Sequence, residues 1–365
     1  MAVWSEHGLG EFVGSTYASR RKEVVRRCSH LSRSRCAASG GKMYDKYFAA
    51  VVLSRRALTD RIAEFRIGAE DGRRLPMAEA GSHIELRFGG EGGQFLRHYS
   101  VVGPLHLHDE LEPFWRIAVQ RENRSRGSAF IHDNFRAGTQ LRISRPINAF
   151  RLSRNQPHTL LVAGGIGITP MFAMARSLLV RKASFSMLYA GLERAAMAYV
   201  DDLDALCDGR LTVHESTHKG IPDLTGLLSG QPSGTVAYIC GPGLMIEALR
   251  DAGSALGWDK DRIRFEVFNA AHKADDEDFA VRVKSGRMIK VGAGTTILDA
   301  LESAGIDTLS DCRRGECGLC ITDVVGCDGS LDHRDRLFSE EERAAGDQIT
   351  ICCSRIKGRV LELDI

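Results

Sequence analysis

The sequence predicts a multidomain protein that consists of an antiparallel β-barrel, an α/β domain with a parallel sheet and a smaller α+β domain. Three observations support this prediction. Short alternating segments with frequent turns come first, buried strands that alternate with helical segments follow, and a cysteine-rich loop lies near the end. A length of 365 residues suits two or three domains.

The first domain is predicted from strand-like segments that begin at Tyr47. Turn residues separate these segments at short intervals, which is typical of a small antiparallel barrel. We therefore expect the barrel over residues 46–153. The segments are YFAAVVLSRRALTDRIAEFRIGA, SHIELRF, LRHYSVVG, FWRIAVQRE and TQLRISRP.

The pattern changes after Phe150, where strands and helices alternate. HTLLVAGGIGITPMFAMARSLLVR combines a buried strand, a glycine turn and a helix, and FSMLYAGL is a second buried strand. A helix is expected at AAMAYVDDLDALC, strands at LTVHEST and TVAYICGP, and a further helix at LMIEALRDAGSAL. This alternation predicts a parallel sheet with both faces covered, over residues 154–269.

The last domain is expected over residues 279–365. FAVRV and RMIKV predict a hairpin, TILDALESAG predicts an amphipathic helix, and RVLELDI predicts a closing strand. The acidic stretch at residues 270–278 has no apolar periodicity and is predicted to be a linker. Residues 1–45 are rich in Arg and Ser and are predicted to be a disordered extension. A flexible basic arm that contacts an acidic partner is the alternative.

Composition excludes several classes of function. A net charge of +2 gives no argument for nucleic-acid binding. No apolar run approaches the length of a membrane span, and the N-terminus lacks the apolar region of a secretory signal. Ten cysteines without an export signal indicate a reducing compartment, where thiols remain available for metal. We therefore expect a soluble cytoplasmic protein that binds neither nucleic acid nor membranes.

The segment DCRRGECGLC places Cys312, Cys317 and Cys320 at C-x₄-C-x₂-C spacing. This is the spacing of plant-type [2Fe–2S] loops, whose fourth thiolate comes from further along the chain. Gly315 and Gly318 allow the tight turns that bring three thiolates together. Zinc sites usually use two separated cysteine pairs, which fits this loop poorly.

The fourth ligand is expected in the segment ICCSR, which contains Cys352 and Cys353. Spacing alone does not choose between these two cysteines. Cys327 is a third candidate, but it lies in a predicted hairpin, VVGCDGS, and is expected to be an ordinary residue.

Two segments of the α/β domain predict a nucleotide-binding cleft. AGGIGITP, from Ala163 to Pro170, follows a strand and begins a helix, whose free N–H groups attract anions. The loop differs from G-x-G-x-x-G, so close packing between strand and helix is the alternative. The turn CGP, from Cys240 to Pro242, follows another strand of the same sheet, where ligands of such sheets bind.

Two segments of the barrel carry candidate cofactor contacts. In RHYS, Arg97 can pair with an anion, Tyr99 can stack on a ring and Ser100 can form a hydrogen bond. The alternative is an amphipathic strand with its usual polar face. The turn SRGS, at residues 125–128, offers an arginine, a glycine backbone and a hydroxyl to a phosphate, and its alternative is a plain surface turn.

In this order, the segments R-x-Y-S, GG-x-G-x-TP and CGP resemble those of the ferredoxin–NAD(P)⁺ reductase superfamily. The additional C-terminal [2Fe–2S] loop resembles the phthalate dioxygenase reductase family, which includes the vanillate O-demethylase reductases. The resemblance covers roughly residues 46–365. It implies an FMN-binding barrel, an NAD-binding α/β domain and a C-terminal ferredoxin domain with a β-grasp fold.

The resemblance also implies a set of site residues. It makes Cys352 the fourth cluster ligand, because the family's C-x-S-R ending matches Cys352 to Arg355. It brings Glu266 and Phe268 near the flavin, and simple core packing is the alternative for Phe268. The implied FMN contacts are Arg97, Tyr99, Ser100, Val119, Gln120, Arg126, Gly127 and Ser128. The implied NAD contacts are Gly164, Gly165, Gly167, Thr169, Pro170, Cys240, Gly241 and Pro242.

The implied activity is an NADH-dependent reductase that passes electrons through FMN and [2Fe–2S] to a separate Rieske-type oxygenase. That oxygenase is expected to act on an aromatic acid or a methylated compound. NADH is favoured because YAGLER offers only Arg194 to a 2′-phosphate. Hydride transfer needs no acid–base pair, so no catalytic histidine is predicted, and we expect a monomer. The alternatives are a reductase for another acceptor, such as a cytochrome P450, and a non-catalytic redox sensor or electron carrier.

Overall fold

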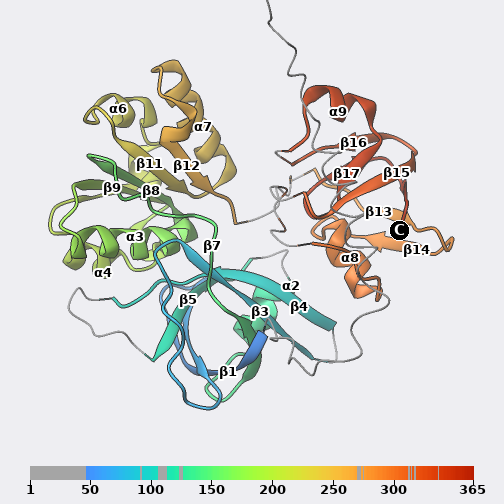
Figure 1. Cartoon of the computed structure of the whole chain (residues 1–365), viewed down its shortest axis with the longest axis horizontal. Helices are drawn as coiled ribbons and strands as arrows, with labels where there is room; N and C mark the ends of the chain where they lie inside the picture. Colours follow the sequence, from blue (N-terminus) through green and yellow to red (C-terminus); the bar gives the residue numbers. More distant parts are fainter. Residues whose placement is uncertain are drawn as a thin grey trace, which may run out of the picture. The chain divides into compact units, whose positions relative to one another are not determined.

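The computed structural model confirms the predicted fold class, with a near-closed antiparallel barrel, a parallel α/β sheet and a small mixed-sheet domain (Figure 1). The predicted N-terminal extension lies outside the described residues. Within the described part of the chain, every helix is too short or too polar to cross a membrane. The structure describes residues 47–90, 93–105, 113–122, 126–268, 273, 275–310, 313, 315, 318–335 and 337–365.

The barrel is a seven-stranded sheet in which the path β4-β3-β6-β1-β2-β5 is antiparallel throughout and β7 pairs with β3. Its core contains Phe65, Ile84 and Ile117, and helix α2 (Arg126–Asn134) adds the buried Ile131. The strands are β1 (Tyr47–Ala57), β2 (Ile62–Ala69), β3 (Ser82–Gly90), β4 (Gly93–Ser100), β5 (Phe114–Gln120), β6 (Gln140–Ser144) and β7 (Ile147–Asn148).

The α/β domain has a five-stranded parallel sheet in the order β10-β9-β8-β11-β12. Its helices cover both faces, because adjacent residues of β8 alternate between two hydrophobic cores. The strands are β8 (Thr159–Gly164), β9 (Phe185–Gly191), β10 (Leu211–Glu215), β11 (Val236–Cys240) and β12 (Ile263–Glu266). The helices are η1 (Gly165–Gly167), α3 (Ile168–Val180), η2 (Arg194–Ala196), α4 (Val200–Cys207), α5 (Ser216–Lys219), α6 (Leu224–Ser229), α7 (Gly243–Ala255) and η3 (Lys260–Arg262).

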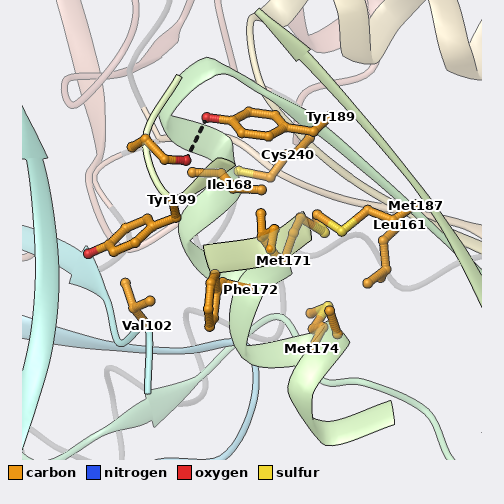
Figure 2. Close-up of a cluster of buried hydrophobic side chains, with 14 of the residues drawn as sticks. Val102, Leu161, Ile168, Met171, Phe172, Met174, Met187, Tyr189, Tyr199 and Cys240 are labelled. Atoms are coloured by element: carbon orange, nitrogen blue, oxygen red, sulfur yellow. Dashed lines mark hydrogen bonds between the residues drawn. The ribbon is translucent and has the colours of Figure 1, made fainter. Parts of the chain in front are cut away.

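The barrel and the α/β domain share one hydrophobic core. Val102 follows strand β4 of the barrel and belongs to the same cluster as Phe172 of α3 and Tyr199 (Figure 2). The Tyr199 hydroxyl also donates a buried hydrogen bond of 3.0 Å to Glu64 Oε2 on β2. These contacts join the two domains through both apolar and polar groups.

The C-terminal domain combines a five-stranded mixed sheet, in the order β14-β13-β19-β15-β17, with the two-stranded sheet β16-β18. The predicted hairpin of β13 and β14 and the predicted helix α8 are both confirmed. The strands are β13 (Phe279–Arg282), β14 (Met288–Val291), β15 (Ile321–Cys327), β16 (Ser330–Asp332), β17 (Gln348–Thr350), β18 (Arg355–Lys357) and β19 (Val360–Leu363). The helices are α8 (Ile297–Ser303) and α9 (Glu340–Ala345).

Three local predictions differ from the structure. VVGCDGS is not a hairpin, because β15 pairs with β17 and β19 while β16 pairs with β18. The helix predicted from AAMAYVDDLDALC begins only at Val200, since Tyr199 has a left-handed φ of 59° that interrupts the helical backbone. The predicted turn at SRGS continues into a helix, because α2 begins at Arg126.

Candidate functional site

The start of helix α2 lies against strand β4 of the barrel. A Cβ atom added at Gly127 would lie 2.8 Å from Arg97 Nε, so glycine allows this close approach. Arg97 Nη1 donates to the carbonyl of Leu96 at 2.9 Å and to Asp299 Oδ1 of α8 at 3.2 Å. A guanidinium beside the first turn of a helix makes an electropositive site that suits a phosphate.

Strand alternation separates the three predicted contacts of RHYS. Arg97 and Tyr99 lie on one face of β4, whereas Ser100 points to the other face and is buried. Burial raises the pKa of Tyr99, and the nearby Arg97 charge only partly opposes this effect. The Tyr99 phenol therefore stays neutral at physiological pH and remains able to donate a hydrogen bond or to stack.

The end of β5 and the start of α2 are joined by Glu122. Its backbone N–H donates to Ser128 Oγ at 3.0 Å, and its Oε1 accepts from Gln120 Nε2 at 2.8 Å. Val119 lies in the barrel core, so its side chain packs inside. The sequence carried no signal for Glu122, because its role depends on a contact between separate elements. The side chain of Arg126 lies outside the described residues.

The glycine loop after β8 packs tightly on the CGP turn after β11. A Cβ atom at Gly164 would lie 2.6 Å from Pro242 Cδ, and one at Gly167 would lie 2.1 Å from the carbonyl oxygen of Cys240. Gly165 is different, because its φ is +54° and no atom lies within 4 Å of the same position. Gly164 and Gly167 thus serve close packing, whereas the Gly165 backbone is open to a ligand.

The two loops meet where the connections of the sheet change direction. From β8 the chain moves to β9 on one side, and β11 lies on the other side with β12 beyond it. Ligands of open α/β sheets bind at this switch point, outside the carboxyl ends of the strands. Helix α7 begins there after Pro242 without a side-chain cap, so its first N–H groups can meet an anion.

Three further predicted residues surround this region. Thr169 Oγ1 donates to the carbonyl of Ile166 at 3.1 Å, and both Thr169 and Pro170 are buried, so they support the turn. Glu266 is buried at the end of β12, in register with Cys240 of β11. Phe268 is 36% exposed and belongs to none of the described core clusters.

Cys320 and Cys352 lie together in the C-terminal domain, and both are buried. The pKa of the Cys352 thiol is raised, first because it shares a hydrogen bond with Cys320, then by Cys353 and by burial. Two buried thiols at such close range cannot both ionise without a cation, so this donor pair fits an iron centre. Cys312 and Cys317 lie outside the described residues.

The loop before Cys320 has the backbone that a compact cluster loop requires. Gly315 and Gly318 both have a φ of +75°, a conformation that glycine adopts at low cost. A Cβ atom at Gly315 would lie 2.6 Å from Cys353 Sγ, so the loop packs directly on the ICCSR segment. Cys353 Sγ contacts Thr350 Oγ1 at 3.2 Å. The Cys353 sulfur therefore takes part in a hydrogen bond within the domain.

Comparisons with known proteins agree with this geometry. Residues 281–357 match the family model of the 2Fe-2S iron-sulfur cluster binding domain, and residues 142–263 match the N-terminal domain of dimethylamine monooxygenase subunit DmmA-like proteins. The vanillate O-demethylase oxidoreductase of Pseudomonas sp. (strain HR199 / DSM 7063) is 36% identical, over 86% of this chain and 99% of its own length.

Two further proteins extend the comparison. The heme-dependent oxidative N-demethylase beta subunit of Ectopseudomonas mendocina (strain ymp) is 35% identical, over 85% of this chain and 96% of its own length. The solved structure of phthalate dioxygenase reductase, described as a modular structure for electron transfer from pyridine nucleotides to [2Fe-2S], superimposes with a TM-score of 0.73. It is 28% identical and covers 87% of this chain and 98% of its own.

The match over nearly the whole of these relatives, together with the paired thiols and the switch-point loops, confirms the resemblance found in the sequence. The chain therefore belongs to the phthalate dioxygenase reductase family of the ferredoxin–NAD(P)⁺ reductase superfamily, as an oxidoreductase with a C-terminal [2Fe–2S] domain that serves as the reductase component of an oxygenase system.

Proposed function

We propose that the protein is an NADH-dependent reductase that uses FMN and a [2Fe–2S] cluster to supply electrons to a separate Rieske-type oxygenase. The observation that carries this proposal is the presence of three sites in one chain. An electropositive helix start lies in the barrel, a nucleotide cleft lies in the α/β domain, and a thiol pair lies in the C-terminal domain. Bound FMN would accept a hydride from NADH and release its electrons singly, which is the chemistry that joins these sites.

FMN is favoured by the start of α2. FMN ends in a phosphate, and Gly127 and Ser128 lie in the first helical turn, beside the Arg97 guanidinium. Arg97 would also stabilise negative charge on a reduced ring, and Tyr99 would stack on it or donate a hydrogen bond. In this arrangement Val119 and Ser100 support the strands, because their side chains are buried.

NADH is favoured by the charges beyond strand β9, where a 2′-phosphate would lie. Arg194 Nη2 donates to Asp201 Oδ1 at 2.7 Å and to Asp204 Oδ2 at 2.5 Å, so its charge is already neutralised. Glu215 Oε2 accepts the backbone N–H of Arg194 at 2.9 Å and adds a further negative charge. A 2′-phosphate would have to displace these carboxylates, whereas the ribose hydroxyls of NADH would not.

The cluster ligands are proposed as Cys312, Cys317, Cys320 and Cys352. The adjacency of Cys320 and Cys352 supports the last two, and the C-x₄-C-x₂-C spacing supports the first two. Cys353 is the weaker candidate because the family's C-x-S-R ending matches Cys352, with Cys353 at the variable position. The buried setting of the thiols would exclude water from the cluster.

A haem-containing oxygenase is the second candidate for the acceptor. The 35% identity to a heme-dependent oxidative N-demethylase subunit favours it. The two acceptors can be separated directly. If this protein and NADH reduce a purified Rieske-type oxygenase but not a purified oxygenase that contains haem, the first candidate is supported.

One experiment tests the core of the proposal. The visible spectrum of the purified protein is recorded, NADH is added without oxygen, and the flavin is then released and identified. We expect flavin and iron–sulfur bands that both bleach, and FMN as the released flavin. Release of FAD would overturn the FMN assignment, and bleaching with NADPH but not NADH would overturn the nucleotide preference. A cluster that stays oxidised after the flavin is reduced would contradict the electron path.

A further inference from the structure

The described part of the predicted linker, residues 273 and 275–278, packs on the C-terminal domain. The side chain of Asp276 is only 3% exposed. Arg334 donates two hydrogen bonds to its carboxylate, from Nη1 to Oδ2 at 3.0 Å and from Nη2 to Oδ1 at 2.5 Å. The backbone N–H of Lys273 donates to Oδ2 at 3.0 Å. A buried carboxylate requires such partners, so Asp276 holds the described residues of this segment against the C-terminal domain.

Asp276 belongs to a larger group of charges. Arg334 Nε also donates to Asp332 Oδ2 at 2.9 Å, and Lys273 Nζ donates to Asp332 Oδ1 at 3.0 Å. Arg355 Nε lies 3.7 Å from Asp276 Oδ2. Burial alone would raise the pKa of Asp276, but hydrogen bonds from Arg334 and Lys273 and the charge of Arg355 outweigh it and lower the pKa. We name Lys273, Asp276, Asp332, Arg334 and Arg355 the ion-pair network.

The ion-pair network is connected to the segment that carries Cys352. The backbone N–H of Arg334 donates to Ser354 Oγ at 3.1 Å. Ser354 Oγ lies 2.7 Å from Thr350 Oγ1, which in turn lies 3.2 Å from Cys353 Sγ. Thr350, Cys353 and Ser354 are all buried, so water does not compete for these bonds.

Arg355 ties the same segment to two other parts of the domain. Its Nη1 donates to the carbonyl of Thr295 at 2.6 Å, and its Nη2 donates to the carbonyl of Glu277 at 2.9 Å. Because Arg355 follows Cys352 closely in the chain, these bonds fix the backbone on the C-terminal side of that cysteine. The segment around residue 276 thus holds the ICCSR segment through both side chains and backbone.

We propose that the ion-pair network positions Cys352 for the [2Fe–2S] cluster and sets the local charge around it, with Asp276 as the positioning residue. The inference rests on the proposed assignment of Cys352 as the fourth ligand. Three cations face two carboxylates in the network. Loss of the Asp276 charge leaves a larger positive excess, which favours the more negative, reduced cluster. Loss of the Lys273 charge has the opposite effect.

Three variants of the full-length protein with its cofactors bound test the proposal. Asp276→Asn removes the buried charge, and Lys273→Met removes a half-exposed cation of the network. Asp364→Asn is the control, because this carboxylate lies in the same domain but pairs with Lys284 outside the ion-pair network. The midpoint potential of the cluster is measured by redox titration, and the rate of cluster loss is measured from the visible absorption in the presence of a chelator.

We expect a more positive potential and about tenfold faster cluster loss in Asp276→Asn, since partners of metal ligands typically contribute ~10- to 100-fold to metal affinity. Lys273→Met should shift the potential in the negative direction, and Asp364→Asn should change neither quantity. A structural defect alone would not produce shifts of opposite sign.

The proposal is overturned if Asp276→Asn and Asp364→Asn give the same potential and the same rate of cluster loss. If Asp276→Asn does not accumulate as folded protein, Lys273→Met provides the test. A cluster potential in Lys273→Met equal to that of the wild type then overturns the proposal. Cys352→Ser tests the ligand assignment separately. If Cys352→Ser retains a normal cluster, the ligand assignment fails. If it loses the cluster while Asp276→Asn behaves like the control, only the ion-pair network inference fails.

Discussion

Cys352 and Cys353 are adjacent, identical in type and both buried, yet their surroundings differ. The two thiols share a hydrogen bond with each other, but Cys352 also shares one with Cys320 of the cluster loop, whereas Cys353 contacts the hydroxyl of Thr350. The hydrogen bond to Cys320 places the Cys352 sulfur beside a thiol of the cluster loop, as expected for two ligands of one metal centre. The roles of neighbouring residues are therefore set by what each sulfur faces.

This difference predicts opposite results for two serine substitutions. Cys352→Ser should abolish the [2Fe–2S] signal in the electron paramagnetic resonance spectrum of the reduced protein, because a thiolate ligand is lost. Cys353→Ser should keep the signal, since a hydroxyl can still bond to Thr350. Flavin content serves as the control and should be unchanged in both variants. A signal that disappears only in Cys353→Ser would reverse the ligand assignment.

Arg194 gives a second prediction at the residue scale. Asp201→Asn combined with Asp204→Asn should release its guanidinium and make it available to a 2′-phosphate. The ratio of kcat/KM for NADPH to that for NADH should rise about tenfold, which corresponds to ~1.4 kcal/mol. Arg194→Gln in the same background should cancel the gain. An equal rise in that triple variant would show that Arg194 is not the group responsible.

At the scale of elements, the loop between β8 and α3 combines two uses of glycine. Gly167 packs against the Cys240 carbonyl of the neighbouring strand β11. Backbone atoms form this contact, so it leaves no room for a side chain at Gly167. Gly165 has a left-handed backbone but open space around it. Gly167 therefore lets the loop pack against the end of β11, whereas Gly165 leaves the backbone of the loop exposed.

The two glycines should respond differently to alanine. Gly167→Ala should lower the free energy of unfolding by about 1–3 kcal/mol, because the added methyl group forces the CGP turn away. Gly165→Ala should cost only about 1–2 kcal/mol of backbone strain, and its main effect should be a higher KM for NADH. Thermal unfolding and steady-state kinetics with ferricyanide as acceptor separate the two effects. An unchanged KM in Gly165→Ala would argue against nucleotide contact at that position.

At the scale of the whole molecule, one carboxylate connects residues of the barrel and of the cluster loop. Asp299 Oδ1 accepts from Arg97 Nη1 at 3.2 Å and from Arg313 Nη1 at 3.1 Å. Burial alone would raise the pKa of Asp299, but the charges of Arg97 and Arg313 outweigh this effect and lower the pKa. Arg97 is the proposed flavin contact, and Arg313 lies in the sequence between the proposed cluster ligands Cys312 and Cys317. Asp299 therefore links a residue of each proposed cofactor site.

Loss of this carboxylate should slow electron transfer between the two cofactors. Asp299→Asn should leave the rate of flavin reduction by NADH unchanged and lower the rate of cluster reduction, as measured by stopped-flow absorbance. Salt should slow cluster reduction in the wild type more than in the variant, because it screens this ion pair. Asp364→Asn is the matched control, since its ion pair with Lys284 joins two residues of the same domain. Equal salt dependence in wild type and Asp299→Asn would contradict the prediction.

The fold class and most elements of the described chain were predictable because they depend on local patterns. Apolar alternation predicted the barrel strands, and the change to buried strands with helices after Phe150 predicted the parallel sheet. The start of α9 was also predictable from local residues, because Ser339 and Glu342 have the spacing of a capping box and exchange hydrogen bonds. The late start of α4 was not readable, because the left-handed Tyr199 is stabilised by its buried bond to Glu64.

The sequence by itself determined the family, the order of the domains and the type of chemistry, since cysteine spacing and glycine loops are local features. Only the tertiary structure decided which residues meet. It brought Cys320 to Cys352, the start of α2 to Arg97, and Asp276 of the predicted linker to Arg334. These contacts join residues far apart in the chain, and their free energy depends on burial and on partners that no local pattern specifies.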